Sequence, residues 1–277
     1  KKPVQTVKIE AQYDSNLIYF PPTGTLFSPN TKFIKAHDLT KNKIYKIQHS
    51  KVVVERPANN CISRICGNFV LFLDGMEMMI LNTNNLNLTK IKIGEATSEI
   101  VDYIQLGGTK IAVLSRHRAQ RKKGVVKIYD IVKKQLISVF KVELKNSFGT
   151  EASPTLFYNY LQDKLIVYRG SERSGMDLVA GLTIFELRTG RASSPGFKIP
   201  ENGYDRILKI QYCDANESIY LATNEGEIFQ IYLKQGGIGS LGEFKGLAEM
   251  GTHPFWDGVL ILFEPQGGLL KMGFVYA

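Results

Sequence analysis

Residues 110–131 read KIAVLSRHRAQRKKGVVKIYDI, with two short apolar runs on either side of a basic segment. The runs, Lys110–Leu114 and Val125–Ile131, are rich in Ile, Val and Leu and show no helical periodicity. Their length and their branched side chains are typical of β-strands. The stretch therefore predicts two neighbouring strands joined by a basic connection, and flanking runs at Ile100–Leu106 and Gln135–Val142 extend the unit to four strands.

The same unit recurs along the chain. In each copy the third strand ends with one residue between two large ones, centred on Asp38, Asn82, Asp130, Glu186 and Tyr232, with a weaker sixth copy at Met272. The intervals are 44, 48, 56, 46 and 40 residues. Four short strands in every 40 to 50 residues are typical of propeller blades. We predict an all-β fold, a β-propeller of about six four-stranded blades, or seven if sequence is missing.

We expect residues 1–277 to form a single propeller domain. The last copy stops after its third predicted strand, Gly268–Val275, which would leave a sheet edge exposed. Either a strand at Val4–Ile9 closes the ring, or more chain follows. The chain begins with Lys1 and not with Met, so an excised piece of a longer protein stays open as an interpretation.

Composition excludes several classes of protein. A content of 44% hydrophobic and 22% charged residues supplies a core, which argues against disorder. No apolar run reaches the roughly 20 residues of a membrane span. Three cysteines, Cys61, Cys66 and Cys213, form neither a disulfide framework nor a zinc motif, so we predict buried reduced thiols and an intracellular protein, nuclear or cytoplasmic. Sequons at Asn87 and Asn216 keep a secreted alternative open.

The segment Lys127–Ile131 resembles the strand end of a WD-repeat-like β-propeller, although the Trp-Asp hallmark is absent there. Three later segments, Ile219–Phe229, Asp257–Leu262 and Gly267–Met272, are similar to part of a narrower multi-propeller family. That family includes the large subunits of the damage-specific DNA-binding protein and of the cleavage-and-polyadenylation factor. The resemblance implies a non-enzymatic scaffold in a nuclear assembly.

Catalytic motifs are missing from the sequence. It has no His-Glu-x-x-His helix, no Gly-x-Ser-x-Gly elbow and no phosphate-binding glycine loop. We therefore predict no catalytic residues, no metal and no small-molecule cofactor. Asp214 and Glu217 fall in a predicted turn. A glycosidase-like propeller enzyme, with two carboxylates facing across a central channel, stays as an alternative.

Two predicted connections carry the candidate binding residues. The first spans Arg116–Gly124 and the second Arg169–Asp177, and the candidates in them are Arg116, His117, Arg118, Arg121, Lys122, Lys123, Arg169 and Arg173. Alternate connections of an antiparallel blade emerge at the same end, so we expect both on one face. A protein partner, nucleic acid phosphates, or only solvent are the three interpretations. No aromatic residue interleaves with the basic run, so base stacking is not supported.

The sequence as a whole predicts a propeller scaffold that binds other protein subunits in an intracellular multi-subunit assembly. A net charge of +9 slightly favours a nuclear or RNA-associated complex, with nucleic acid as a second partner through the basic loop. A vesicle-coat or tethering propeller is the alternative, because charge alone does not separate the two.

Overall fold

The fold was analysed in a computed structural model. It describes residues 18–20, 24–29, 33–41, 43–48, 63–66, 68–74, 76–145, 152–174, 177–199, 206–214, 216–244, 249–252, 259–266 and 269–276. The chain divides into two compact units. Unit 1 comprises residues 1–96 and 131–134, and unit 2 comprises residues 97–130 and 135–277.

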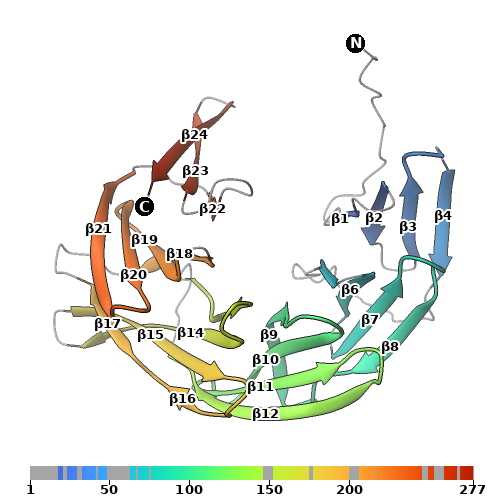
Figure 1. The fold of residues 1–277 in the computed structure, drawn as a ribbon, viewed down its shortest axis with the longest axis horizontal. Helices are drawn as coiled ribbons and strands as arrows, with labels where there is room; N and C mark the ends of the chain where they lie inside the picture. Colours follow the sequence, from blue (N-terminus) through green and yellow to red (C-terminus); the bar gives the residue numbers. More distant parts are fainter. Residues whose placement is uncertain are drawn as a thin grey trace. The chain divides into compact units, whose positions relative to one another are not determined.

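Unit 1 contains two four-stranded antiparallel sheets, each with its strands in chain order (Figure 1). The first sheet consists of β1 (Ile18–Phe20), β2 (Thr25–Pro29), β3 (Phe33–Asp38) and β4 (Lys43–Gln48). The second consists of β5 (Ser63–Cys66), β6 (Phe69–Asp74), β7 (Glu77–Asn82) and β8 (Leu88–Lys92). Ala36 of the first sheet packs with Val70, Phe72, Met79 and Leu81 of the second, so the two sheets share a core.

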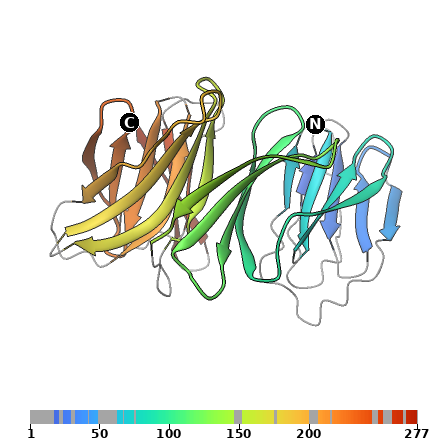
Figure 2. The same cartoon turned by 90° about the horizontal axis from the view of Figure 1, so that it is seen from below.

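Unit 2 contains four further antiparallel sheets, with strands in chain order except at the outer side of one sheet. Its strands are coloured from green to red in Figure 2. Its first sheet comprises β9 (Ser98–Gln105), β10 (Lys110–His117), β11 (Lys123–Asp130) and β12 (Gln135–Glu143). Its second sheet comprises β13 (Thr155–Asn159), β14 (Lys164–Ser174), β15 (Asp177–Glu186), β16 (Ala192–Ser193) and β17 (Gly196–Ile199). Its last two comprise β18 (Ile207–Cys213), β19 (Ser218–Thr223), β20 (Glu227–Tyr232), β21 (Gly237–Glu243), and then β22 (Glu249–Thr252), β23 (Val259–Gln266) and β24 (Leu269–Tyr276).

A shared core joins the sheet β9–β12 to the sheet β13–β17. Leu114 and Val126 from the first sheet are buried with Leu165 and Val167 from the second. The rings of Phe140 on β12 and Phe185 on β15 lie 4.8 Å apart between their centroids. Burial of both faces explains why these strands read as continuous apolar runs in the sequence.

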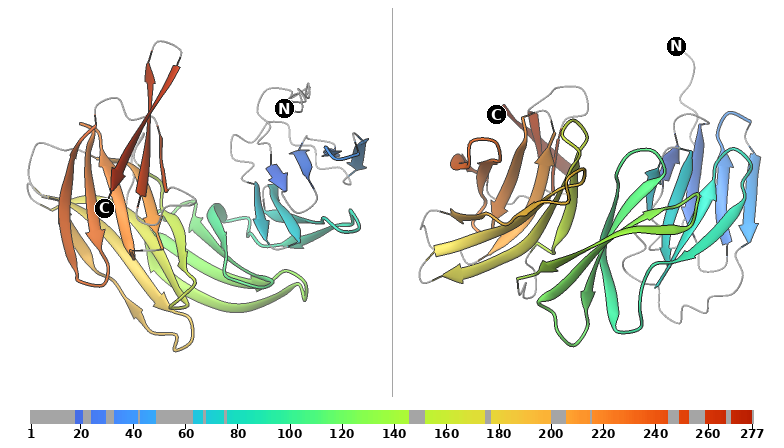
Figure 3. Two further views of the ribbon diagram at one scale, coloured as in Figure 1. Left: turned by 45° about the horizontal axis from the view of Figure 1, so that its top comes forward. Right: turned by 60° about the horizontal axis from the view of Figure 1, so that its bottom comes forward.

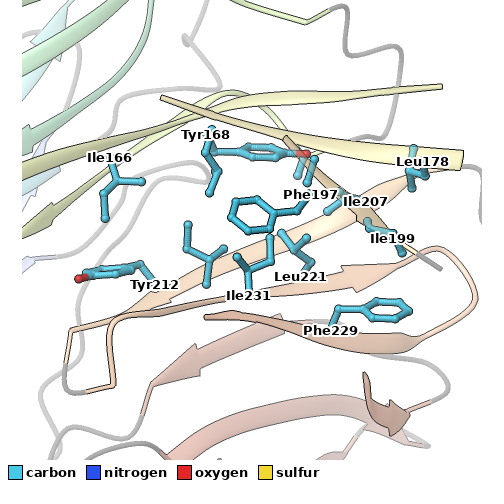
Figure 4. Close-up of a cluster of buried hydrophobic side chains, with 14 residues drawn as sticks. Ile166, Tyr168, Leu178, Phe197, Ile199, Ile207, Tyr212, Leu221, Phe229 and Ile231 are labelled. Atoms are coloured by element: carbon cyan, nitrogen blue, oxygen red, sulfur yellow. The ribbon is translucent and has the colours of Figure 1, made fainter. Parts of the chain in front are cut away.

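A second shared core joins the sheet β13–β17 to the sheet β18–β21 (Figure 4). Tyr168 and Phe197 come from one sheet, and Leu221, Phe229 and Ile231 come from the other. Each is buried to at least nine-tenths of its surface. The opposite face of the sheet β18–β21 is also apolar, because Tyr220, Ala222 and Ile228 form another buried cluster there. The first three sheets of unit 2 therefore pack face to face in chain order.

These observations confirm the all-β fold and its repeating antiparallel four-stranded sheets. The predicted last copy is present as β22–β24, whose three strands pair in order. One sheet departs from the expected pattern, because its outer strand is split into β16 and β17, and both pair with β15. The predicted strand Val4–Ile9 lies outside the described residues. Blade number, ring closure and the single domain stay predictions.

The predicted burial of reduced thiols is confirmed for one of the three cysteines. Cys213 is a free thiol and is buried. Cys61 and the side chain of Cys66 lie outside the residues that the structure describes.

Candidate partner-binding hairpin

The predicted basic connection is shorter than the sequence suggested. Strand β10 continues to His117 and β11 begins at Lys123, so the turn between them is only residues 118–122. Arg116 is paired with Gly124 in the ladder. The prediction that Arg116, His117 and Lys123 belong to a loop is therefore wrong, because backbone pairing continues beyond the apolar residues that mark the strands in the sequence.

Backbone hydrogen bonds hold this turn in a defined conformation. The amide of Lys123 donates to the carbonyl of Gln120 over 2.8 Å, and the amide of Arg118 donates to the carbonyl of Thr97 over 2.8 Å. The amide of Gln120 donates to Nδ1 of His117 over 3.1 Å. A neutral His117 ring therefore carries its proton on Nε2. The backbone of the hairpin is therefore held in a defined conformation, which fixes the points from which its charged side chains extend.

Arg116 is already paired inside the sheet. Its Nε donates to Oε1 of Glu99 on the neighbouring strand β9 over 2.7 Å, and its Nη2 contacts the same oxygen. Its side chain is one-fifth exposed. Arg116 therefore stabilises the pairing of β9 with β10 and contributes little charge to a partner. The sequence could not indicate this pair, because Glu99 and Arg116 become neighbours only through the strand register.

Four cations remain at the surface of the hairpin. Arg118, Arg121, Lys122 and Lys123 are all exposed. Among the described residues, no acidic side chain forms an ion pair with any of them. Four unpaired positive charges within six residues produce a strong local field, which attracts acidic side chains or phosphates.

The second predicted basic connection is a continuous hairpin. Strand β14 runs to Ser174 and β15 starts at Asp177, and the two strands form a long hairpin, coloured yellow in Figure 3. Arg169 and Arg173 therefore lie within a strand, and the loop prediction is wrong for both. Gly170, with a φ of 99°, sits at a register shift after Tyr168. A bulge of this kind lets the strand bend and continue. Polar residues in the stretch gave it the composition of a loop.

Arg169 and Arg173 have different surroundings. Arg173 is exposed, whereas Arg169 is partly buried and its Nε lies beneath the surface without a hydrogen-bond partner. The Arg169 guanidinium lies over Gly181 of β15, where an added Cβ would come within 3.3 Å of Nη2. Gly181 therefore provides the space for this side chain. Arg169 is directed against its own sheet, which makes it a weak candidate for binding a partner.

A two-residue segment after β12 connects the two hairpins. The amide of Leu144 donates to the carbonyl of Lys122 over 2.8 Å, and the amide of Lys145 donates to the carbonyl of Arg169 over 2.7 Å. The ammonium of Lys145 also pairs with Glu172, 2.5 Å away. The end of the β10–β11 hairpin and the bulged part of β14 therefore lie side by side.

Acidic residues elsewhere in unit 2 are engaged between turns. Tyr158 donates its hydroxyl to Asp163 over 2.7 Å, Gln162 donates to Glu217 over 2.5 Å, and Tyr212 donates to Asp214 over 3.2 Å. Burial, and then the hydrogen bond to Asp163, raise the pKa of Tyr158 to about 12. Glu217 therefore links the turns of two adjacent sheets, whereas Asp163 and Asp214 are each bonded within their own sheet.

Metal binding and membrane spanning each require a recognisable arrangement of residues. Within the described part of the chain, no group of three His, Cys, Asp or Glu residues is placed to hold a metal ion. Nor do these ranges include a helix with the length and apolarity to cross a membrane.

Comparisons with known proteins show a likeness to solved structures and none to a known sequence. Neither a family model nor a curated protein matches the sequence, so the narrower multi-propeller resemblance gains no support. Among solved structures, the β-propeller domain of Cps50 (Swd1) from Myceliophteria thermophila aligns over 99% of this chain and 100% of its own length. The identity is 12% and the TM-score is 0.49. A likeness at this level carries no argument about function.

Proposed function

We propose that this chain is a non-catalytic scaffold of the β-propeller type, with about six blades, that binds protein subunits of an intracellular assembly. The repeating four-stranded sheets, which pack face to face in unit 2, support the propeller. Rigid sheets of this kind hold their connecting turns in fixed positions, which suits recognition of a partner.

The exposed cations of the β10–β11 hairpin are the observation that carries the binding role. Arg118, Arg121 and Lys122 lie in a turn that backbone hydrogen bonds hold in place, and Lys123 is the first residue of the strand that follows it. An acidic partner surface would meet a prearranged set of charges and would be attracted over long distances. The net positive charge slightly favours a nuclear or RNA-associated assembly, and a vesicle-coat or tethering propeller is the alternative, because charge alone does not separate the two.

A charge-removal experiment tests the role of the hairpin. The variant Arg118→Ala, Arg121→Ala, Lys122→Ala and Lys123→Ala is compared with a control in which the exposed Lys43, Lys92, Lys110 and Lys234 are each changed to Ala. Both lose four positive charges. Proteins that stay bound to the full chain at physiological salt should be lost from the hairpin variant and retained by the control. Equal retention by both variants would contradict the proposal.

Nucleic acid is a second candidate partner, because exposed Arg and Lys side chains that attract carboxylates also neutralise phosphates. The measurement is the affinity for a single-stranded oligonucleotide at several salt concentrations. If all four cations neutralise phosphates, the logarithm of the association constant falls with a slope of about −3 against the logarithm of salt concentration. The hairpin variant should then show a slope near zero. A slope that the variant leaves unchanged would exclude this hairpin as the nucleic-acid contact.

A further inference from the structure

Strand β12 differs from the other outer strands in its surface. It has nine residues and borders its sheet, where one edge pairs with β11 and the other pairs with no strand among the described residues (Figure 1). Three aliphatic side chains on it are exposed: Leu136 by 43%, Ile137 by 46% and Val139 by 51%. An unpaired edge that carries aliphatic side chains is a template for another strand.

Three other outer strands whose side chains are described, β8, β17 and β21, avoid this combination. Exposed positions on β8, β17 and β21 carry polar or small residues, namely Thr89, Lys92, Gly196, Lys198, Ser240, Gly242 and Glu243. These strands have five, four and seven residues, and are shorter than β12. Short length and charge are the usual protection of a sheet edge against unwanted pairing. On described outer strands the one similar side chain elsewhere is Ile44 of β4, which is 62% exposed.

The geometry of β12 suits the addition of a strand. Residues Ser138 to Glu143 pair with β11 in six uninterrupted register steps, and the single irregularity lies beyond Ser138, where Ile137 is the extra residue. Burial alternates along this stretch, since Phe140 and Val142 are covered while Val139 and Lys141 are exposed. One face of the strand therefore packs into the core, and the backbone along its unpaired edge is regular.

Cations flank this aliphatic edge at both ends. Lys134 precedes the strand in the β11–β12 turn, and Lys141 lies near its other end; both are exposed. Lys123 of the basic hairpin lies opposite Glu143 in the backbone register of β11 and β12. The amide of Leu144 donates a hydrogen bond to the carbonyl of Lys122. Residues 133–143 contain three lysines and one glutamate, so two copies of this strand would repel each other. A peptide with acidic ends would be attracted.

We propose that β12 accepts an extended segment of a partner protein as an added strand. The segment has Asp or Glu at both ends and Val, Ile or Thr in its centre. At about 3.3 Å per residue, nine residues separate its acidic ends by roughly 25 to 30 Å, which matches the length of the strand. Backbone hydrogen bonds supply the affinity, and the aliphatic side chains and lysines supply the selectivity. This inference rests on the proposed role in binding protein partners, and it names the partner's chemistry.

A display library of random twelve-residue peptides tests the proposal with the full chain as bait. The peptides that are enriched should have acidic ends and a β-branched centre. Their affinity, measured by fluorescence anisotropy, should fall at least tenfold in Val139→Asn and at least tenfold in the pair Lys134→Glu and Lys141→Glu. Matched controls, Ile44→Asn and the pair Lys110→Glu and Lys234→Glu, should stay within twofold. Circular dichroism confirms that each variant is folded.

Hydrogen exchange locates the bound peptide. Binding should slow the exchange of amides in residues 135–143. The proposal is overturned by enriched peptides without acidic ends, by failure to enrich any peptide, or by affinities that Val139→Asn leaves unchanged. It is also overturned in favour of self-association if sedimentation shows a dimer that Val139→Asn dissociates. If the alanine variant of the hairpin loses its partners while Val139→Asn retains them, the proposed function survives and this inference fails.

Discussion

At the scale of single residues, the buried Asp102 carboxylate connects two sheets of unit 2. Asp102 lies on β9 and is 4% exposed, and its Oδ1 accepts from the amide of Tyr103 over 2.8 Å. Its Oδ2 accepts from the hydroxyl of Thr155 and from the amide of Leu156, both on β13. A buried charge is tolerated when hydrogen bonds surround it in this way.

Removing this carboxylate should destabilise the fold. We expect Asp102→Ala to lower the free energy of unfolding by about 2 to 4 kcal/mol, because the donors of Thr155 and Leu156 lose their acceptor inside the protein. Urea denaturation measures the change. Glu143→Ala, at an exposed position of β12, is the control and should change stability by less than about 0.5 kcal/mol. An equal effect of the two substitutions would show that Asp102 has no linking role.

Tyr158 gives the fold a pH dependence in alkaline solution. Its pKa is about 12 in the folded protein against 10.0 for a free tyrosine, so the folded state favours the protonated phenol. This contribution to stability is complete below pH 10 and is lost as the pH rises to about 12. Tyr158→Phe should reduce the slope of unfolding free energy against pH in that window. An unchanged slope in urea denaturation from pH 9 to 12 would contradict the assignment.

At the scale of elements, apolar runs in the sequence predict where strands lie but not where they end. The predicted pair Lys110–Leu114 and Val125–Ile131 corresponds to β10 and β11, yet both strands extend further into the basic segment. Their extension depends on backbone pairing, which has no side-chain signature. The sequence predicts a loop at Arg169 for the same reason. The strand continues there because Gly170 and Gly181 allow backbone pairing past this residue.

The candidate site was predictable only in part. The four exposed cations form a run in the sequence, so the hairpin could be located directly. The pairing of Arg116 with Glu99 depends on strand register, and the exposure of Val139 depends on which strand borders the sheet. Neither is determined by residues that are close in the sequence.

The end of the basic hairpin is closely packed around Gly124 of β11. A Cβ added there would lie 2.8 Å from Cγ of Leu144, which is buried. Gly124→Ala should therefore cost about 1 to 3 kcal/mol of unfolding free energy. Combined with Leu144→Ala, which removes the clashing atoms, it should cost less than the sum of the two single changes.

Two outcomes would contradict this account of Gly124. One is strict additivity of the two substitutions in urea denaturation. The other is an equal loss of stability in Gly237→Ala, the matched control on β21, where the nearest atom to an added Cβ is 3.9 Å away on Tyr232.

At the scale of the whole molecule, shared cores make neighbouring sheets of unit 2 dependent on one another. Leu221 on β19 is completely buried against side chains of the sheet β13–β17. A sheet of this size cannot bury its apolar faces alone, so it gains stability from its neighbours. Such coupling accounts for the regular recurrence of strands in the sequence, because each copy must match the next.

Leu221→Ala should weaken both sheets that contact it. We expect a loss of about 2 to 5 kcal/mol in unfolding free energy. Hydrogen exchange should accelerate in β14 and β15 as well as in β19 and β20 if the sheets open together. The control is Leu161→Ala, at a position 79% exposed, which should leave exchange unchanged. Acceleration confined to β19 and β20 would show that the sheets open independently.

The short turn of the basic hairpin also has a practical consequence. Arg118, Arg121 and Lys122 lie at an exposed tip, the kind of place where trypsin cuts a folded protein first. The strands on either side stay paired with each other and with β9 and β12. A nick at the tip would therefore give two fragments on a denaturing gel from a particle of unchanged native mass. A bound partner that covers the tip would delay the cut, which makes limited digestion a simple footprint of occupancy.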